Sequence, residues 1–589
     1  MDPKSINKMW LQALERTSHL QNNPERTLPI LIDELGQRYG DVVALVSDRE
    51  CLSYKGLAAR ANRYARWGLN LDLQPGDVVG LMMPNRPEYL AIWLGITRIG
   101  GIVALLNTHL TGASLRHSVT VAQPKHVIVA AEFLNIFSNA MRDVPSKPLV
   151  WAHGETVERV PRIDHEIESL PTIPLVLDGR RHVTLSDPAL YIYTSGTTGL
   201  PKAAHVSHQR LMSWSHWFAG MMDVVPGDRM YNCLPMYHSI GGVVAPASLL
   251  VAGGSVVVGE GFSASRFWAD IARWDCTIFQ YIGELCRYLV AAPETEAEQH
   301  HRLRLACGNG LRADVWAAFQ NRFRIPRILE FYAGTEHNFS LFNVEGKPGS
   351  IGRVPSFLRH RFPVALIKLD PQTDEPIRNA EGHCVRCSAG EPGEAIGKYA
   401  DDGSSRFEGY TNPFETERKL IRNVFSEGDL WVRSGDLMCI DDKGYFYFVD
   451  RLGDTFRWKG ENVATTEVSD AISKCPGVLD VCVYGVSVAG AEGRAGMAAI
   501  VTDSSFTLDG LHRQLVERLP DYAIPRFLRM ADTLAATETF KKKKQDLMRE
   551  GYDPSLTGDA LYARDGDGGG FAPLDSLLFE AIRTGQMRL

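Results

Sequence analysis

A dense run of threonine, serine and glycine at residues 194–199 limits what this chain can fold into more than any other feature. The apolar and aromatic stretch from Ala189 to Tyr193 predicts a strand that stops where this run begins. Glycines let the backbone approach an anion closely, and the hydroxyls and amides of such a turn donate hydrogen bonds to phosphate oxygens. Lys202 adds a positive charge, although no Gly-Lys-Ser/Thr opens a helix as in a Walker loop.

A solvated hairpin turn is the alternative interpretation of this run. We favour a polyphosphate-binding loop, because so many donors and glycines are concentrated in so few residues. The loop would comprise Thr194, Ser195, Gly196, Thr197, Thr198, Gly199 and Lys202.

The order of predicted elements around this loop indicates an α/β fold. Short apolar strands at residues 78–83, 102–106 and 126–130 alternate with helical patterns at 57–67 and 89–98. The same alternation continues after the loop as far as residue 332. It predicts mostly parallel sheets covered by helices, in which ligands bind beyond the C-terminal ends of the strands. The phosphate loop occupies such a place.

The chain of 589 residues is too long for a single core, so two or more domains are expected. Between about residues 349 and 450, short strands separated by Gly, Asp and Pro predict a small β-rich subdomain. A compact α+β segment follows from Gly453, and residues from Asp553 onward are polar and Gly-rich before a weakly helical end.

Composition narrows the classes of partner and compartment. The net charge of −7 argues against nucleic acid as a partner. Ten scattered cysteines favour a reducing cytoplasm, and no signal peptide is visible. The most apolar window, residues 89–106, is shorter than a membrane span and contains Arg98, so we expect a buried helix followed by a strand. Peripheral contact with the inner face of a membrane stays open.

The phosphate loop resembles that of the adenylate-forming superfamily, which includes acyl-CoA synthetases, adenylation domains and luciferases. Residues 457–463 (RWKGENV) and 539–541 (TFK) resemble in particular the fatty acid transport protein and very-long-chain acyl-CoA synthetase family. The similarity extends from about Leu28 to the C-terminus. It implies a ligase that joins a carboxylic acid to CoA through an acyl-AMP intermediate, with release of AMP and pyrophosphate from ATP.

The segment 330–336 (EFYAGTE) would hold part of the nucleotide and a metal ion. The resemblance implies that Tyr332 stacks on adenine, Thr335 donates to a phosphate and Glu336 binds Mg²⁺. Mg²⁺ usually takes one or two carboxylates together with phosphates and water. In isolation, a strand-ending turn with a solvated glutamate would be the simpler interpretation. The family pattern is Tyr-Gly-x-Thr-Glu, so Tyr-Ala-Gly-Thr-Glu leaves the shape of this turn open.

Two further segments resemble walls of the acyl and CoA site. Gly308 and Gly310, in the sequence CGNGL, would let backbone pass under the adenine or the acyl chain. His238 ends the sequence LPMYH, whose aromatic or histidine residue lies near the carboxylate substrate in the family. A half-buried surface histidine is the alternative.

Asp436 and Arg451 would bind the ribose. A carboxylate at a buried edge can accept from both ribose hydroxyls, although an Asp after Gly is more often only a turn residue. Arg451 follows Asp436 in the order that the family shows, and it would contact the same ribose or a phosphate.

The resemblance also divides the chain into domains. It implies a large ATP- and acyl-binding domain at residues 1–450, a hinge at 451–453, a small mobile α+β domain at 454–552 and a tail at 553–589. Gly453 would be the pivot, because glycine tolerates wide changes of φ and ψ. The loop around Gly460 would admit the pantetheine arm of CoA.

Lys541 begins a run of four lysines. Such a run is most often a solvated face or a weak patch for anionic lipids. The resemblance implies that Lys541 is the mobile lysine that reaches the α-phosphate and the carboxylate during acyl-AMP formation.

The acyl substrate is the least determined part of the prediction. The family branch implies long or very long fatty acids, and a bile-acid or steroid-carboxylate CoA ligase is the runner-up. A lipid-uptake protein without turnover would predict damage to Lys202, Glu336 or Lys541, and all three are intact. Uptake coupled to acyl activation, and a homodimer, stay open.

Overall fold

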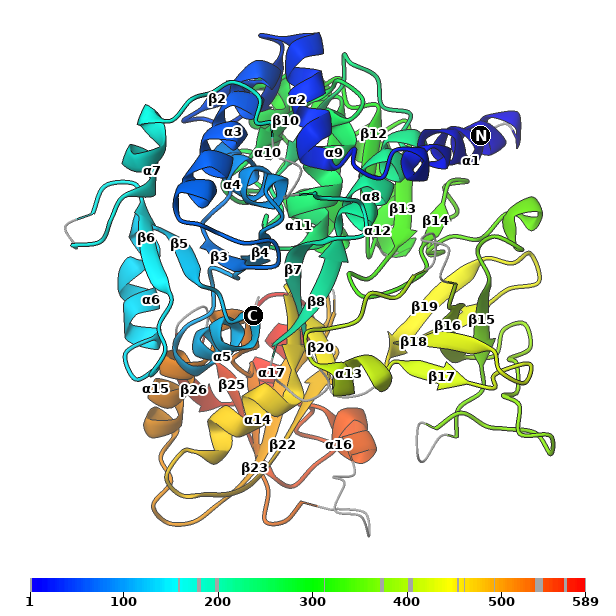
Figure 1. Cartoon of the computed structure of the whole chain (residues 1–589). Helices are drawn as coiled ribbons and strands as arrows, with labels where there is room; N and C mark the ends of the chain where they lie inside the picture. The colour runs from blue at the N-terminus through cyan, green and yellow to red at the C-terminus, as the bar shows by residue number, and fades with distance from the viewer. Residues whose placement is uncertain are drawn as a thin grey trace.

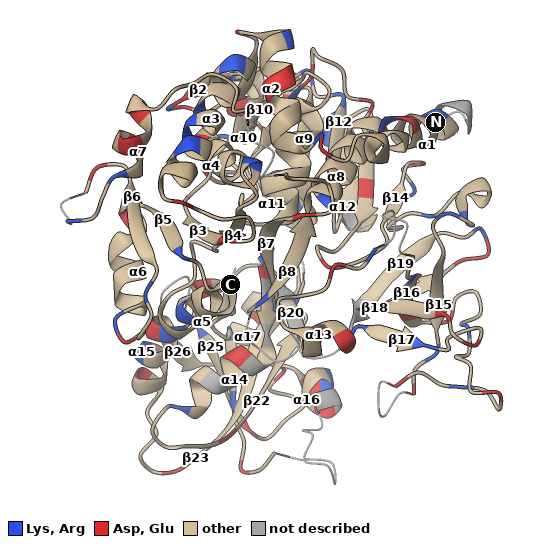
Figure 2. Cartoon of the chain, viewed as in Figure 1, with Lys and Arg blue, Asp and Glu red and all other residues tan. Residues whose placement is uncertain are grey.

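A computed structural model describes residues 3–156, 159–176, 182–195, 201–311, 313–370, 375–400, 406–452, 455–459, 461–491, 493–534, 544–565 and 569–587. Figure 1 shows a large helix-covered body, a β-rich subdomain at its side and a small domain below. Figure 2 shows basic and acidic residues interspersed over helices and loops, while the inner strands of the body carry few.

The first sheet of the body has the order β6-β5-β3-β4-β7-β8. The bounds are β3 (Val78–Met82), β4 (Ile102–Leu105), β5 (His126–Ala130), β6 (Leu149–His153), β7 (Pro188–Ser195) and β8 (Pro201–Ser207). All neighbours are parallel except β7 and β8. Strands β3, β4 and β5 are buried along their whole length, which explains their uninterrupted apolar sequences.

The second sheet has the order β14-β13-β12-β11-β9-β10-β1-β2, with parallel inner strands and antiparallel edges at β2 and β14. The bounds are β1 (Val43–Val46), β2 (Cys51–Ser53), β9 (Arg229–Asn232), β10 (Ser255–Val258), β11 (Ile278–Ile282), β12 (Leu305–Asn309), β13 (Ile328–Tyr332) and β14 (Leu341–Asn343). The alternation of strands and helices predicted as far as residue 332 is therefore confirmed, since β13 ends at Tyr332.

Helices cover both sheets (Figure 1). They are α1 (Pro3–Ser18), α2 (Leu28–Tyr39), α3 (Tyr54–Asn70), α4 (Pro87–Arg98), α5 (Gly112–Ala122), α6 (Leu134–Ala140), α7 (Ile163–Glu166), α8 (His208–Met221), α9 (Ala245–Leu250), α10 (Phe267–Arg273), α11 (Gly283–Ala291) and α12 (Ala313–Arg322). A π-helix, η4 (Ile240–Val244), precedes α9, and short 3₁₀ turns are η1 (Leu20–Asn22), η2 (Ala131–Phe133), η3 (Ile167–Ser169), η5 (Glu296–Gln299) and η6 (Ser356–Leu358).

The apolar window at residues 89–106 forms α4 and β4, as expected, and lies inside the body. Trp93 on α4 is fully buried, and the helix is buried at every position from Pro87 to Thr97. Within the described part of the chain, none of the helices has the length and apolar character needed to cross a membrane.

The β-rich subdomain has the order β15-β16-β18-β17, and β19 pairs with β18. The bounds are β15 (Val364–Ile367), β16 (Gly393–Lys398), β17 (Leu420–Arg422), β18 (Leu430–Ile440) and β19 (Phe446–Arg451), with a short helix α13 (Pro413–Glu417). Its pairings are antiparallel, in keeping with the frequent turn residues between its strands.

The small domain has a hydrophobic core of its own, which begins at Phe456, whereas the body's main core ends at Phe446. The hairpin β20 (Thr455–Trp458) and β21 (Glu461–Ala464) is followed by the sheet β22-β23-β24-β25-β26. The remaining bounds are β22 (Val478–Val486), β23 (Ala495–Thr502), β24 (Phe527–Met530), β25 (Ala560–Arg564), β26 (Phe571–Pro573), α14 (Thr465–Ser473), α15 (Leu508–Arg518), η7 (Asp521–Ala523), α16 (Lys544–Glu550) and α17 (Ser576–Arg583).

The segment predicted to be a tail differs from that expectation. Its strand β25 pairs with β24, β26 pairs with β25, and Ile582 of α17 joins the core of the small domain. The buried Arg564 reaches back to Asp521 at 2.6 Å. The low-complexity sequence hides this role, because only a few apolar residues in the segment face the core.

The predicted fold class is confirmed: helix-covered, mostly parallel sheets and a β-rich subdomain precede a small α+β domain.

Candidate nucleotide and acyl site

A cavity of about 620 Å³ lies where the body, the β-rich subdomain and the small domain meet. Thr194 near the end of β7 and Tyr332 at the end of β13 line it, as do Asp436 of β18 and Glu461 of β21. The parallel strands β7 and β13 thus point their C-terminal ends at the cavity, as the fold class predicts.

Tyr332 and Asp436 form a polar pair in the cavity wall. The Tyr332 Oη donates to the Asp436 Oδ2 at 2.5 Å, and the Asp436 residue is only 3% exposed. The backbone of Asp436 lies opposite Arg451 in the β18–β19 pairing. An aromatic ring beside a buried carboxylate suits a nucleoside, with the ring against the base and the carboxylate on a ribose hydroxyl.

The turn after Tyr332 needs its glycine at Gly334. The His337 amide donates to the Gly334 carbonyl at 3.1 Å, and a Cβ on Gly334 would lie 2.4 Å from the His337 Nδ1. The His337 ring stacks on Tyr332 with the ring centres 5.6 Å apart. The glycine is therefore one position later than in the family pattern, where it leaves room for the His337 ring.

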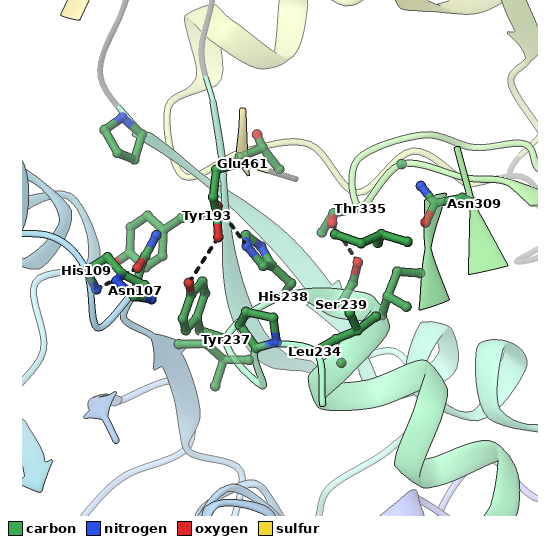
Figure 3. Close-up of a pocket in the computed structure, with 18 of the residues that line it drawn as sticks. Asn107, His109, Tyr193, Leu234, Tyr237, His238, Ser239, Asn309, Thr335 and Glu461 are labelled. Atoms are coloured by element: carbon green, nitrogen blue, oxygen red, sulfur yellow. Dashed lines mark hydrogen bonds and ion pairs between the residues drawn. The ribbon is translucent and has the colours of Figure 1, made fainter. Parts of the chain in front are cut away.

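Thr335 and Glu336 follow in the same loop and line the cavity. The Thr335 Oγ1 lies 3.0 Å from the Ser239 Oγ, which joins two loops of the body (Figure 3). The pKa of the Tyr410 hydroxyl is raised, mainly by burial and secondly by the negative charge of the nearby Glu336 carboxylate. Glu336 therefore lies beside Tyr410.

A carboxylate at a roomy cavity fits Mg²⁺, which takes few protein ligands when phosphates and water supply the rest. In the described ranges, no cluster of three or more His, Cys, Asp or Glu residues suited to a metal is found. Glu336 could therefore hold Mg²⁺ in the manner of nucleotide triphosphate sites rather than in a cage made of protein ligands.

The phosphate loop joins two antiparallel strands, since Thr194 of β7 pairs with Lys202 of β8. Thr194 and Pro201, one at each side of the loop, line the cavity. The predicted loop is thus a hairpin connection, and its two ends reach the cavity. Gly196, Thr197, Thr198 and Gly199 lie outside the described residues, as does the side chain of Ser195.

The Lys202 ammonium donates to Glu415 of α13, and the two side chains are 12% and 11% exposed. Its Nζ lies 5.8 Å from the centre of the Tyr410 ring. The positive charge predicted for phosphate is therefore paired with a carboxylate in this structure.

Gly308 lies within β12, between β11 and β13. A Cβ there would lie 2.2 Å from the Tyr281 carbonyl oxygen, so close strand packing requires glycine. The neighbouring Asn309, which separates Gly308 from Gly310, lines the cavity (Figure 3). The segment reaches the cavity through this asparagine.

His238 and Tyr237 meet Glu461 across the domain boundary (Figure 3). The His238 Nε2 lies 3.4 Å from the Glu461 Oε2, and the Tyr237 Oη donates to the Glu461 Oε1 at 3.4 Å. The pKa of Tyr237 is raised, mainly by burial and secondly by the negative charge of Glu461. The hairpin β20–β21 therefore closes the cavity on the side of His238. Gly460 lies outside the described residues, and Lys459, which precedes it in the sequence, lines the cavity.

Three further predicted residues lie wholly or partly outside the described residues. Gly453 and Lys541 lie outside the described residues, and so does the side chain of Arg451.

Two buried side chains that sequence reasoning missed hold the cavity loops. Arg210 of α8 donates to the Thr335 carbonyl at 2.8 Å and to the His337 carbonyl at 2.9 Å. Asn85 donates to the Leu234 carbonyl and accepts from the Met236 amide, each at 2.9 Å. Asn85 follows closely after an apolar strand, where polar residues often serve a site, so its position was a usable signal. The sequence around Arg210 carried no such signal.

Comparison with known proteins gives these features a family. A family model described as "AMP-binding enzyme" matches residues 32–394, more than half of the chain, and one described as "AMP-binding enzyme C-terminal domain" matches residues 467–541.

Curated relatives extend over nearly the whole length. The chain is 39% identical over 572 residues to long-chain fatty acid transport protein 1 of Mus musculus, covering 96% of this chain and 88% of the relative. It is 40% identical over 531 residues to long-chain fatty acid transport protein 3 of the same species, covering 88% and 78%.

Solved structures share the fold at low identity. The o-succinylbenzoate CoA synthetase of Bacillus subtilis superimposes with a TM-score of 0.71 at 19% identity, covering 88% of this chain and 98% of that chain. The amide bond synthetase of Marinactinospora thermotolerans also gives 0.71, at 20% identity, covering 88% and 99%.

The chain therefore has the fold of an adenylate-forming enzyme. It belongs to the AMP-binding enzyme family, within the branch of the fatty acid transport proteins and very-long-chain acyl-CoA synthetases.

Proposed function

We propose that this chain is an ATP-dependent long-chain or very-long-chain fatty acyl-CoA ligase that acts through acyl-AMP and releases AMP and pyrophosphate. One observation carries the proposal: a single cavity gathers Thr194, Tyr332, Glu336, Asp436 and His238, which the sequence marks in widely separated segments. Such convergence of polar groups on one cavity is the signature of a functional site.

In the first half-reaction the fatty carboxylate attacks the α-phosphate of ATP. Tyr332 and Asp436 would hold the nucleoside, and Thr335 would donate to a phosphate oxygen. Glu336 would hold Mg²⁺, which when bound neutralises charge on the phosphate oxygens. Lys202, Lys541 and the loop from Thr194 to Gly199 would stabilise the charge that develops on the phosphoryl group.

Lys202 would exchange partners when ATP binds. In this structure its ammonium is paired with Glu415, and the pair is largely shielded from solvent. A triphosphate at the loop would supply a competing set of anionic oxygens. Glu415 would then hold the lysine side chain in place until the nucleotide arrives.

In the second half-reaction the thiol of CoA attacks the acyl carbonyl and AMP leaves. The position of Glu461 against His238 supports a role for the small domain in this step. Rotation about Gly453 would withdraw Lys541 and bring the loop around Gly460 to the entry of the pantetheine arm. No side-chain nucleophile is needed, because AMP is the leaving group.

The names of the relatives support a long-chain acyl substrate and favour a second role in fatty acid uptake coupled to activation. A bile-acid or steroid-carboxylate ligase is the alternative within the same chemistry. We also propose a cytoplasmic protein, since none of the ten cysteines forms a disulfide bond. Peripheral contact with the inner face of a membrane is compatible with this proposal. A homodimer is compatible with this arrangement.

Fatty acid-dependent exchange between ATP and labelled pyrophosphate tests the function. We expect exchange with oleate and no exchange without an acid, followed by AMP release and a thioester once CoA is added. A panel of fatty, aromatic and steroid carboxylates then ranks the substrates by kcat/KM. Absence of exchange with every acid would overturn the proposal.

A further inference from the structure

We propose that Glu461 and His238 form a carboxylate–imidazole pair that accepts the thiol proton of CoA in the thioester-forming half-reaction. The inference rests on the proposed ligase function and adds to it a proton acceptor and the residue that orients it. His238 would be the catalytic base, and Glu461 a positioning residue that acts through it.

The pair is assembled from two domains. His238 lies in the loop between β9 and η4 of the body, and Glu461 is the first residue of β21 in the small domain. The His238 Nε2 and the Glu461 Oε2 are 3.4 Å apart, and both residues line the cavity (Figure 3). Neither domain alone contains the pair, so it exists only while the domains dock as they do here.

The two members differ in exposure, as a relay to an incoming substrate requires. The His238 side chain is 42% exposed, so a ligand can reach its ring, whereas that of Glu461 is 18% exposed. The Tyr237 hydroxyl donates to the second oxygen of the Glu461 carboxylate at 3.4 Å. This hydrogen bond orients the Glu461 carboxylate so that its other oxygen faces the imidazole.

The contact selects the form of the imidazole that can act as a base. With Nε2 facing the carboxylate, its hydrogen is placed there, and the lone pair is on Nδ1. A carboxylate behind the ring also stabilises the imidazolium that forms when the proton arrives. His238 is in this way suited to general base catalysis.

The chemical step is balanced without another reactant. The CoA S–H bond breaks, and its proton goes to the His238 Nδ1. The sulfur electron pair forms the C–S bond at the acyl carbonyl carbon of acyl-AMP, and the carbonyl reforms as the C–O bond to AMP breaks. AMP leaves with that electron pair, and the imidazolium later gives its proton to solvent.

The same docking explains why the base would serve one half-reaction. Acyl-AMP formation needs no proton acceptor, because its nucleophile is already a carboxylate anion. A thiol is mostly protonated at neutral pH, so the second attack gains from a nearby base. The small domain would therefore bring Glu461 to His238 when a base is useful.

Other ionisable groups share this cavity wall and must be considered in any pH study. They are His109, Tyr193, Cys233, Tyr237, Glu260, Tyr332, Glu336, His337, Lys419, Asp436, Lys459, Glu467 and Tyr522. Of these, Tyr237 donates a hydrogen bond to Glu461. Glu467 of α14 forms a separate contact between the domains, accepting from the Ser114 Oγ at 2.7 Å.

Glu461→Gln in the full-length protein tests the proposal, with the two half-reactions measured apart. Oleoyl-AMP mixed with CoA in single turnover should give thioester about 10²-fold more slowly than the unaltered protein, the size typical of losing general base catalysis. Pyrophosphate exchange with oleate should change far less, by under about threefold. The acidic limb of the thioester rate against pH should move to lower pH, because the carboxylate no longer favours imidazolium.

Two variants separate a proton role from a merely structural one. Glu467→Gln alters the other carboxylate at the domain boundary and should leave the ratio of the half-reactions within about threefold. Glu461→Asp keeps the charge and should restore part of the rate and the position of the acidic limb.

The inference is overturned if Glu461→Gln slows both half-reactions equally, or if its acidic limb stays in place. An equal effect of Glu467→Gln on the thioester step would also overturn it, in favour of simple docking. If the unaltered protein catalyses no exchange with any acid, the ligase function fails instead, so the two failures are distinguishable.

Discussion

The cavity wall proposed to meet the nucleotide and the wall proposed to meet the acyl group and CoA are built in different ways. Tyr332 and Asp436 both come from parts of the large domain and are hydrogen-bonded to each other. His238 and Glu461 come from domains with separate hydrophobic cores and touch only through longer contacts of 3.4 Å.

The difference teaches which groups can serve both halves of the reaction. ATP and acyl-AMP carry the same adenosine, so a wall fixed within one domain suits both. The proposed rotation of the small domain would exchange the groups that it presents to the cavity, so each would serve one half-reaction. We therefore expect substitutions of Tyr332 or Asp436 to affect both half-reactions. Substitutions at the contact between the two domains should affect only one.

Lys541→Ala should give the largest effect and the clearest test of this division. We expect the rate of acyl-AMP formation to fall by about 10³-fold, because the variant lacks the positive charge proposed to stabilise the phosphoryl transition state. Thioester synthesis from supplied acyl-AMP should be largely spared. Pyrophosphate exchange and single-turnover thioester formation measure the two steps, and equal loss of both would refute the assigned role.

Low pH should lower the free energy of unfolding of the large domain, because its buried histidines favour the neutral ring in the folded state. Burial lowers the pKa of the fully buried His208 to about 4, from an ordinary value of 6.5. Folding therefore favours the neutral ring, and stability is lost as the pH falls from about 6.5 towards 4. The loss should reach about 3 kcal/mol for this residue. His216 on the same helix has its pKa lowered to about 4 by burial as well and acts in the same direction.

Urea unfolding at pH 7 and at pH 4.5 measures this loss. A His208→Gln variant should have a smaller difference between the two pH values than the unaltered protein. An unchanged difference would mean that other groups control the acid sensitivity.

Asp436→Asn should weaken the use of both ATP and acyl-AMP. The variant keeps the shape of the side chain but removes the charge that accepts from Tyr332 and, as proposed, from the ribose. A hydrogen bond to a charged group contributes about 1.5–3 kcal/mol, so kcat/KM should fall about 10- to 100-fold for each substrate. Steady-state kinetics with each substrate checks this, and an effect on ATP alone would contradict a wall shared by both half-reactions.

Ser114→Ala should give the smallest effect, confined to the docked state. It removes the hydrogen bond from α5 to Glu467, which contributes about 1 kcal/mol at most in such a partly exposed place. Thioester formation should slow by no more than about fivefold, with pyrophosphate exchange unaffected. A larger loss in exchange than in thioester formation would show that this contact belongs to the other domain arrangement.

Much of the fold could be predicted because its inner strands are buried on both faces. The apolar runs that form β3, β4 and β5 follow directly from this environment. The strand before the predicted phosphate loop could be located but not the strand after it, since β8 begins with Pro201-Lys202, residues that do not suggest a strand. The last two strands of the small domain were missed because polar glycine-rich sequence separates them.

The residues of the candidate site also fall into two groups: those that the local sequence indicates, and those that only the folded chain brings together. Tyr332, Glu336 and Asp436 were recognisable because each follows or lies within a distinctive local segment. Arg210 and Glu461 act on residues about 125 and 223 positions away, through contacts that only the folded chain creates. The contact between Lys202 and Glu415 was equally hidden, because neither sequence neighbourhood refers to the other.

The completion of the small domain's sheet by β25 and β26, with α17 close behind, has a consequence for biosynthesis. The large domain can fold while the ribosome is still translating. The small domain must wait until β25 and β26 have left the ribosome, because these strands complete its sheet. An unfinished chain would thus be able to bind nucleotide before it can transfer an acyl group to a thiol.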